Sequence, residues 1–214
     1  MKIRTALKRK LWMRTAFKKL IVRKESYLHT TGWIESLRRG YPCDAEGAEV
    51  PWMNYPVVNF LKERLNKDLT LFEFGSGYST LFYAKRVRDV TSVEYNREWY
   101  DFMTEKEIDN VSLLYREKDV DGTYCRTINE SDREYDIIVV DGRDRVNCVI
   151  QGIEKLTSKG IILLDDSSRD RYTAAIEHAK TKGFRSLDIE GLKPTGYGID
   201  RTTVLYRDDN CLGL

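Results

Sequence analysis

Apolar and polar positions form alternating blocks from residue 57 onward, and these blocks predict helices and strands in turn. Apolar residues at helical spacing over 57–65 are followed by an apolar strand at 69–74, and the succession continues to residue 206. We expect strands at 69–74, 90–94, 111–115, 135–140, 161–164, 184–189 and 202–206, and helices at 57–65, 80–87, 98–108, 146–156 and 172–182. Repeated strand–helix units predict a doubly wound, mostly parallel sheet of the α/β class, with ligands at the carboxyl ends of its strands.

Two segments with other patterns precede this domain, which we assign to residues 57–214. Residues 1–24 predict a basic helical extension, because their apolar residues fall near one side of a helix, although Lys10, Arg14 and Lys18 interrupt that side. Residues 25–56 are rich in aromatic and turn residues and are too apolar for a linker. This aromatic cap segment either packs over the mouth of the domain, where it would help to shape a substrate pocket, or packs as core against the first helix.

Charge is distributed unevenly along the 214 residues. The extension holds ten Lys and Arg and no acid, whereas the remainder holds 26 basic and 34 acidic residues. The extension could be solvated or bound to a protein, or it could attach to an anionic membrane surface; nucleic acid is disfavoured because the acidic body offers no basic groove.

The four cysteines are scattered, and no apolar run approaches the roughly 20 residues of a membrane span. We therefore expect a cytoplasmic protein, peripheral to a membrane if the extension attaches there.

The most informative motif joins the first strand to the next helix. Glu73 lies near the strand end, Gly75-x-Gly77 follows, and then come the hydroxyl residues Ser79 and Thr80. Glycines let a ligand approach the backbone because no Cβ intervenes, and the helix N-terminus offers unpaired N–H groups. A dinucleotide motif would have its third glycine where Thr80 stands. Glu73 would repel a pyrophosphate but suits the ammonium group of an amino-acid moiety.

A second acid, Glu94, ends the second strand 19 residues after Gly75, where a carboxylate can accept hydrogen bonds from ribose hydroxyls. Together, Glu73-x-Gly75-x-Gly77-x-Ser79 and Glu94 resemble the class I S-adenosylmethionine-dependent methyltransferases. The resemblance covers residues 57–207 and implies a Rossmann-like, seven-stranded fold, S-adenosylmethionine as the cofactor, and an acid near the adenine. The implied cofactor-binding residues are Glu73, Gly75, Ser76, Gly77, Ser79, Thr80, Glu94, Asp119 and Asp141.

Three more carboxylates follow the fourth and fifth predicted strands: Asp141, and the pair Asp165 and Asp166. Because these strands should be neighbours, the acids would meet at the mouth of the sheet. The pattern resembles the catechol and caffeoyl-CoA O-methyltransferases, in which such acids hold a divalent cation, and oxygen ligands suit Mg²⁺. The resemblance implies catalytic and metal-binding roles for all three. Without a metal, Asp141 would contact cofactor or substrate and Asp165 or Asp166 would act as the base.

Basic residues beside Asp141 depart from the metal-dependent pattern. Arg143 and Arg145 would repel a cation and would suit an anionic substrate such as a carboxylate or phosphate. Tyr197, in the glycine-rich loop 191–198, would touch substrate if that loop covers the pocket, although turn glycines also suit a plain connection. Neither histidine has a Ser or Cys partner at a recognisable spacing, so we expect no nucleophilic triad.

These features predict an S-adenosylmethionine-dependent methyltransferase that acts on an oxygen of a small or glycan-like, anionic acceptor. Two alternatives remain. An NAD-linked oxidoreductase is disfavoured by Glu73 and by Thr80. A non-catalytic adaptor would keep the cofactor fold and act through the basic extension, residues 1–24.

Overall fold

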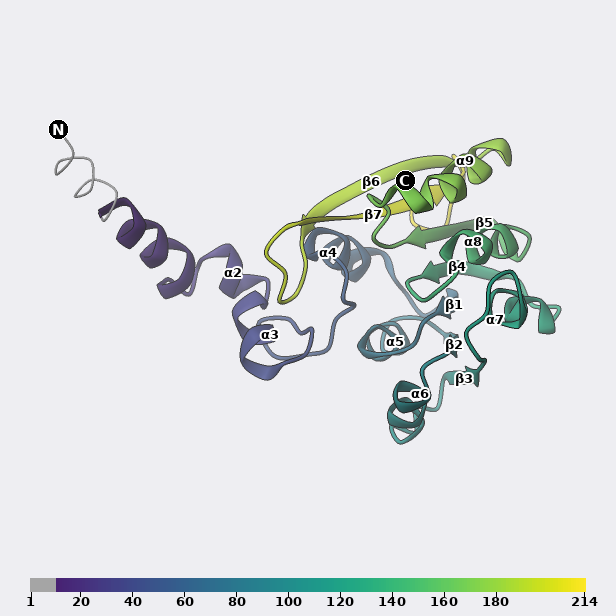
Figure 1. Ribbon diagram of the computed structural model, residues 1–214, viewed down its shortest axis with the longest axis horizontal. Helices are drawn as coiled ribbons and strands as arrows, with labels where there is room; N and C mark the ends of the chain where they lie inside the picture. Colours follow the sequence, from purple (N-terminus) through teal and green to yellow (C-terminus); the bar gives the residue numbers. More distant parts are fainter. Residues whose placement is uncertain (1–10) are drawn as a thin grey trace.

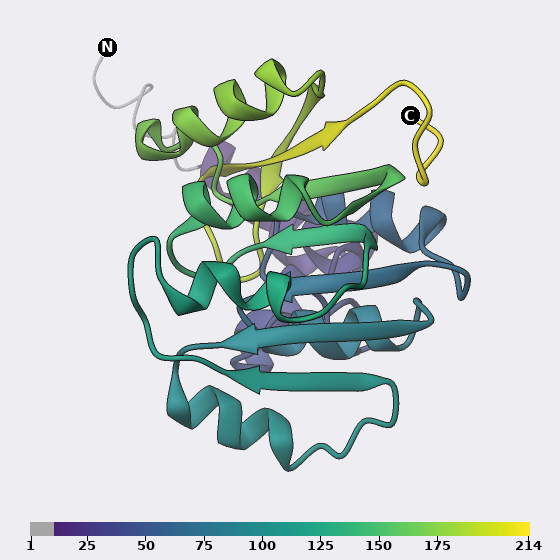
Figure 2. The same cartoon turned by 90° about the vertical axis from the view of Figure 1, so that its right-hand side faces the viewer.

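The computed structural model describes residues 11–214, and its central element is a seven-stranded sheet in the order β3-β2-β1-β4-β5-β7-β6. Figure 2 shows the strands one above another, with β3 at the lower edge. Strands β1 to β5 are parallel, and β7 runs antiparallel to both of its neighbours. The predicted fold class is therefore confirmed. The strands are β1 (Thr70–Phe74), β2 (Asp89–Glu94), β3 (Val111–Tyr115), β4 (Tyr135–Val140), β5 (Leu156–Leu164), β6 (Arg185–Leu192) and β7 (Ile199–Tyr206).

Alternate residues of the central strands face opposite layers of helices. Phe72 and Phe74 of β1 belong to one core with residues of α7 (Thr123–Arg126), α8 (Arg145–Ile153) and α9 (Thr173–Thr181). Leu71 of the same strand belongs to a second core with α4 (Tyr55–Arg64) and α5 (Tyr78–Ala84). Both faces of β1 and β4 are thus covered, which is why these strands are almost continuously apolar. One more helix, α6 (Arg97–Thr104), packs against β2 and β3.

Element boundaries differ from the prediction in the C-terminal half of the chain. Helix α8 ends at Ile153, and β5 begins at Leu156 because Leu156 pairs with Tyr135 of β4. Residues 158–160 therefore lie within β5, whereas the prediction began this strand at residue 161. Between β3 and β4 the chain forms α7 and η2 (Thr127–Glu130), where no element was predicted. Single turns of this length have no periodicity to detect, and α7 is capped by Asp119, whose carboxylate accepts the backbone N–H groups of Thr123 and Tyr124.

The segments before α4 lie at one end of the sheet, beside the loop that joins β6 to β7 (Figure 1). Residues 11–17 form an α-helix that continues as η1 (Lys18–Val22), and this helix projects away from the sheet. The predicted helical extension is thus confirmed for residues 11–22, and its first ten residues lie outside the described part of the chain. The cap segment contains α2 (Tyr27–Thr30) and α3 (Trp33–Arg39), and η3 (Asp170–Tyr172) precedes α9. Among residues 11–214, no helix combines the length and apolarity needed to cross a bilayer.

Candidate functional site

The glycine loop between β1 and α5 lies at the carboxyl edge of the sheet. Gly75 has a φ of +99°, and a Cβ there would lie 2.9 Å from the Cα of Gly142, so this position brings the loops after β1 and β4 into contact. A Cβ on Gly77 would have no atom within 4 Å. The loop backbone at residue 77 therefore borders open space that any side chain would partly fill, as a close ligand approach requires.

Glu73 lies beneath this loop with no exposed surface. Its carboxylate accepts hydrogen bonds from the hydroxyls of Ser79, Thr80 (2.5 Å) and Ser92 (2.9 Å). Thr80 in turn accepts the backbone N–H of Gly77 at 3.0 Å, so Glu73 holds the loop in shape through one relay. Burial raises the pKa of Glu73 to about 7, although the three hydroxyls act to lower it. Contact between Glu73 and a cofactor ammonium group stays a prediction.

Glu94 closes the other side of the loop. Its Oε2 accepts the N–H of Ser76 at 2.8 Å, and its Oε1 accepts the N–H groups of Tyr95 (2.9 Å) and Asn96 (2.7 Å). Burial raises the pKa of this carboxyl, and the three backbone N–H groups oppose the rise. Both acids of the sequence motif are thus fixed at one edge of the sheet, one under the glycine loop and one beside it.

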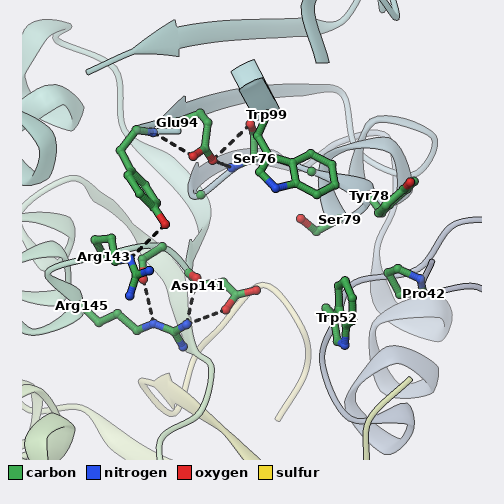
Figure 3. Close-up of a pocket in the computed structure, with 14 residues that line it drawn as sticks. Pro42, Trp52, Ser76, Tyr78, Ser79, Glu94, Trp99, Asp141, Arg143 and Arg145 are labelled. Carbon is green, nitrogen blue, oxygen red and sulfur yellow. Dashed lines mark hydrogen bonds and ion pairs between the residues drawn. The ribbon is translucent and has the colours of Figure 1, made fainter. Parts of the chain in front are cut away.

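A cavity of about 350 Å³ opens above the loop, and both halves of the chain contribute to its wall (Figure 3). Predicted site residues line it at Gly75, Ser76, Gly77, Ser79, Glu94, Asp141, Arg143 and Arg145. Aromatic residues that we did not predict as site residues also line it: Tyr78, Tyr95 and Trp99. Their place in the sequence could have indicated them, because Tyr78 directly follows the glycine loop, and Tyr95 and Trp99 follow Glu94. Thr80 and Glu73 are buried below the cavity, and Asp119 lies outside its wall as the cap of α7.

The cap segment supplies the opposite wall through Pro42 and Trp52, which lie across the cavity from Arg143 in Figure 3. The Trp52 indole donates a hydrogen bond to the carbonyl of Pro194 at 3.1 Å, and the Trp33 indole donates to the carbonyl of Gly196 at 2.7 Å. The cap therefore both shapes the cavity and holds the β6–β7 loop. Tyr197, at the tip of this loop, is fully exposed and does not line the cavity. Its predicted contact with substrate is not supported by this position.

Arg145 is committed to the protein rather than to a substrate. Its guanidinium donates to the carboxylate and carbonyl of Asp141 (both 2.9 Å), to the Gly142 carbonyl (3.1 Å) and to the Asp165 carbonyl (2.5 Å). The predicted anion-binding role of Arg145 is therefore corrected to a positioning role. Burial and the charge of Asp165 raise the pKa of Asp141 well above its ordinary value, and Arg145 opposes the rise only in part.

The predicted metal centre does not form as expected. Asp165 and Asp166 come together with Asp200, and their oxygens lie within 4.8 Å of one another. The ammonium group of Lys193 lies among them, at 3.0, 2.8 and 2.6 Å respectively. The third predicted ligand, Asp141, is held instead by Arg145. A divalent cation does not fit a set whose oxygens already surround the ammonium of Lys193, so the structure does not support the metal.

The two predicted acids of this cluster, Asp165 and Asp166, also lie away from the cavity. Asp165 has no exposed surface, and its other oxygen accepts a hydrogen bond from Thr202 at 2.7 Å. Burial acts to raise the pKa of Asp166, but the hydrogen bond and charge of Lys193, together with the charges of Arg145 and Arg169, lower it overall. Neither group fits the predicted role of base. Of the three predicted catalytic acids, Asp141 alone lines the cavity.

Comparisons with known proteins concern the fold. No protein-family model matches this sequence, and no curated protein matches it significantly. Among solved structures, a putative O-methyltransferase from Klebsiella pneumoniae superposes with a TM-score of 0.55 at 15% identity, over 91% of this chain and 94% of that chain. A precorrin-6y C5,15-methyltransferase from Geobacter metallireducens gives 0.54 at 16% identity, over 72% and 87%. A putative methyltransferase from Streptococcus mutans, in complex with SAH, gives 0.50 at 13%, over 69% and 94%.

These neighbours share the sheet and its flanking helices with the present chain. Because the identities are low, the similarity establishes architecture and leaves chemistry to the site itself. The chain has the Rossmann-like fold of the class I S-adenosylmethionine-dependent methyltransferases.

Proposed function

We propose that this protein is an S-adenosylmethionine-dependent methyltransferase that transfers the methyl group to an oxygen atom. The observation that carries the proposal is the open glycine loop between two fixed acids, at the carboxyl edge of a methyltransferase-type sheet. A pyrophosphate at that loop would lie above the buried Glu73 carboxyl, which disfavours a second anion there, so a dinucleotide is the weaker candidate.

The residues around the loop divide the work of binding the cofactor. The backbone of residues 75–77 and the hydroxyl of Ser79 would hold the amino-acid part. Glu94 would hold the ribose, because its carboxylate lines the cavity and is fixed there by the backbone N–H groups of Ser76, Tyr95 and Asn96. Tyr95 and Trp99 offer apolar walls for a flat base. When bound, S-adenosylmethionine supplies an electrophilic methyl group on a sulfonium sulfur.

Asp141 is the residue we assign as the base. Arg145 fixes Oδ1, whereas Oδ2 accepts no hydrogen bond from any described residue and the side chain keeps 22% of its surface exposed in the cavity. A carboxyl with a raised pKa takes up a proton more readily from an acceptor hydroxyl than an ordinary aspartate does. Arg145 favours the ionised carboxylate that is needed before the proton is taken up.

Arg143 supports an anionic acceptor. It lines the cavity, its Nε donates to the Tyr95 hydroxyl at 3.0 Å, and none of residues 11–214 offers it a carboxylate at ion-pair distance. The guanidinium therefore has donors left for a carboxylate or phosphate on the acceptor.

Calorimetric titration tests the cofactor assignment. We expect S-adenosylhomocysteine to bind and NAD not to bind. Gly77→Ala should weaken S-adenosylhomocysteine at least tenfold, while Gly198→Ala, whose Cβ also meets open space but lies outside the cavity, should bind as the wild type does. Binding of NAD alone would favour an oxidoreductase, and binding of neither would favour an adaptor.

The acceptor assignment needs labelled S-adenosylmethionine and a panel of hydroxyl compounds with and without carboxylate or phosphate groups. We expect Arg143→Gln to raise KM for anionic acceptors about tenfold and to leave neutral acceptors unchanged, since one charged hydrogen bond is lost. Arg88→Gln, a change next to the start of β2 and outside the cavity wall, serves as the control. Equal losses for charged and neutral acceptors would contradict the assignment.

A further inference from the structure

The helix formed by residues 11–22 carries a continuous apolar stripe that nothing in the described chain covers. Trp12, Met13, Ala16, Phe17 and Leu20 follow the spacing i, i+1, i+4, i+5 and i+8, so they share one side of a helix. The four large side chains are exposed to 69%, 46%, 59% and 50% for Trp12, Met13, Phe17 and Leu20. This stripe shares Phe17 with the interrupted side considered in the sequence but otherwise consists of different residues, and no charged residue lies within it.

Basic residues surround the stripe. Arg14, Lys18 and Lys19 lie outside it on the same helix, and Arg23 and Lys24 follow directly. The whole segment 1–24 holds no acid, whereas the remainder of the chain has an excess of acidic residues. The combination of exposed tryptophan and phenylalanine on one side and lysine and arginine on the others is typical of helices that lie in the interface of a bilayer.

Two hydrogen bonds join the C-terminal end of this helix to the cap segment. His29 lies with Nε2 2.7 Å from the carbonyl oxygen of Ile21, and the Ser26 hydroxyl donates to the Leu20 carbonyl at 2.8 Å. Next along the chain, α3 holds the β6–β7 loop through Trp33. In Figure 1 the helix, α3 and this loop occupy the same end of the molecule. A surface that binds the helix would therefore face the end where the cap segment closes the cavity.

We propose that residues 11–24 bind an anionic lipid bilayer, with the Trp12–Leu20 stripe in the interface and the basic side chains at the headgroups. A nucleic acid would use the charge and leave the stripe in water. A second copy would bring ten further Lys and Arg beside the first ten, at a cost in repulsion. The proposal does not depend on methyl transfer.

Vesicle sedimentation with the full chain tests it, using phosphatidylcholine vesicles with and without phosphatidylglycerol. We expect binding that requires phosphatidylglycerol, together with a blue shift of tryptophan fluorescence that Trp12→Phe abolishes. Trp12→Ser/Phe17→Ser should lose binding at least tenfold. Val120→Ser, which changes a side chain 79% exposed in the loop after β3, should bind as the wild type does.

Charge is tested separately by Lys18→Gln/Lys19→Gln. Each basic residue near an anionic surface contributes about a fivefold factor, so the pair should lower the partition coefficient roughly 25-fold. The control Lys118→Gln/Arg171→Gln removes two exposed charges elsewhere and should change binding less than twofold.

Absence of wild-type binding, or equal binding by the Trp12→Ser/Phe17→Ser variant, would overturn the proposal. So would light scattering that shows a wild-type dimer dissociated by Trp12→Ser/Phe17→Ser, or fluorescence shifts produced by DNA and not by vesicles.

Discussion

Replacing Glu73 with glutamine should change how the stability of this protein depends on pH. The side chain has no exposed surface, and its carboxylate is held by three hydroxyls without a cationic partner among the described residues. Glutamine keeps an oxygen that accepts from those hydroxyls and removes the titrating proton. The comparison of the two proteins therefore isolates the contribution of one ionisation.

The sign follows from the pKa in each state. Burial raises the pKa of Glu73 to about 7 in the folded protein, from an ordinary value of 4.5. The folded state therefore holds the proton more tightly, and the stability that this provides is present below pH 4.5 and lost as pH rises through 7. At 1.36 kcal/mol per pKa unit, the loss between pH 5 and pH 8 is about 2.5 kcal/mol.

Urea unfolding of both proteins from pH 5 to pH 8 provides the measurement. We expect the stability of Glu73→Gln relative to the wild type to rise by about 2.5 kcal/mol across this range. Glu134→Gln, at an exposed glutamate, controls for the change in net charge. Parallel profiles for Glu73→Gln and the wild type would refute the reasoning, because they would mean that Glu73 has the same pKa folded and unfolded.

Three further outcomes follow from the same site. Gly75→Ala should lower the free energy of unfolding by about 1–3 kcal/mol because of its positive φ and the contact at Gly142, whereas Gly77→Ala should leave thermal unfolding unchanged; equal effects would contradict the described loop. Lys193→Met should cost about 3–5 kcal/mol in urea unfolding, since it removes the cation shared by Asp165, Asp166 and Asp200 and leaves Asp200 without an ion-pair partner among the described residues. Mg²⁺ should restore part of this loss and have no effect on the wild type; stabilisation of the wild type by Mg²⁺ would reinstate a metal site. Asp141→Asn should lower kcat by a factor of about 100 or more and leave S-adenosylhomocysteine binding within threefold in calorimetry, and an unchanged kcat would remove Asp141 as base.

The sheet was predictable because its signals are local and repeated. Buried parallel strands such as 135–140 are largely apolar on both faces, and the two glycines of the loop indicate the turn after β1. The two acids of the motif were predictable for the same reason, since each lies at a fixed distance from the glycines. What sequence could not supply was the direction of a side chain: Glu73 points beneath the loop, toward hydroxyls whose own positions depend on the fold.

Contacts between residues far apart in the sequence explain why the predicted roles of Asp165, Asp166 and Arg145 were wrong. Asp165 and Asp166 follow β5 as expected, but Lys193 reaches them from the end of β6, 27 or 28 residues away. Nothing near the acids in the sequence indicates this lysine. Arg145 was correctly placed beside Asp141, and its adjacency favoured a substrate role; the fold instead directs its donors to carbonyls of two loops.

The indole contacts of Trp33 and Trp52 have a consequence for which loop variants of this protein can fold. Both indoles bind main-chain carbonyls of the β6–β7 loop, at Gly196 and Pro194, and neither reads a side chain there. Substitutions within the loop can thus alter the chemistry it presents while its anchorage is retained. Diversified libraries at 195–198 should accordingly yield folded proteins, provided that both tryptophans are kept.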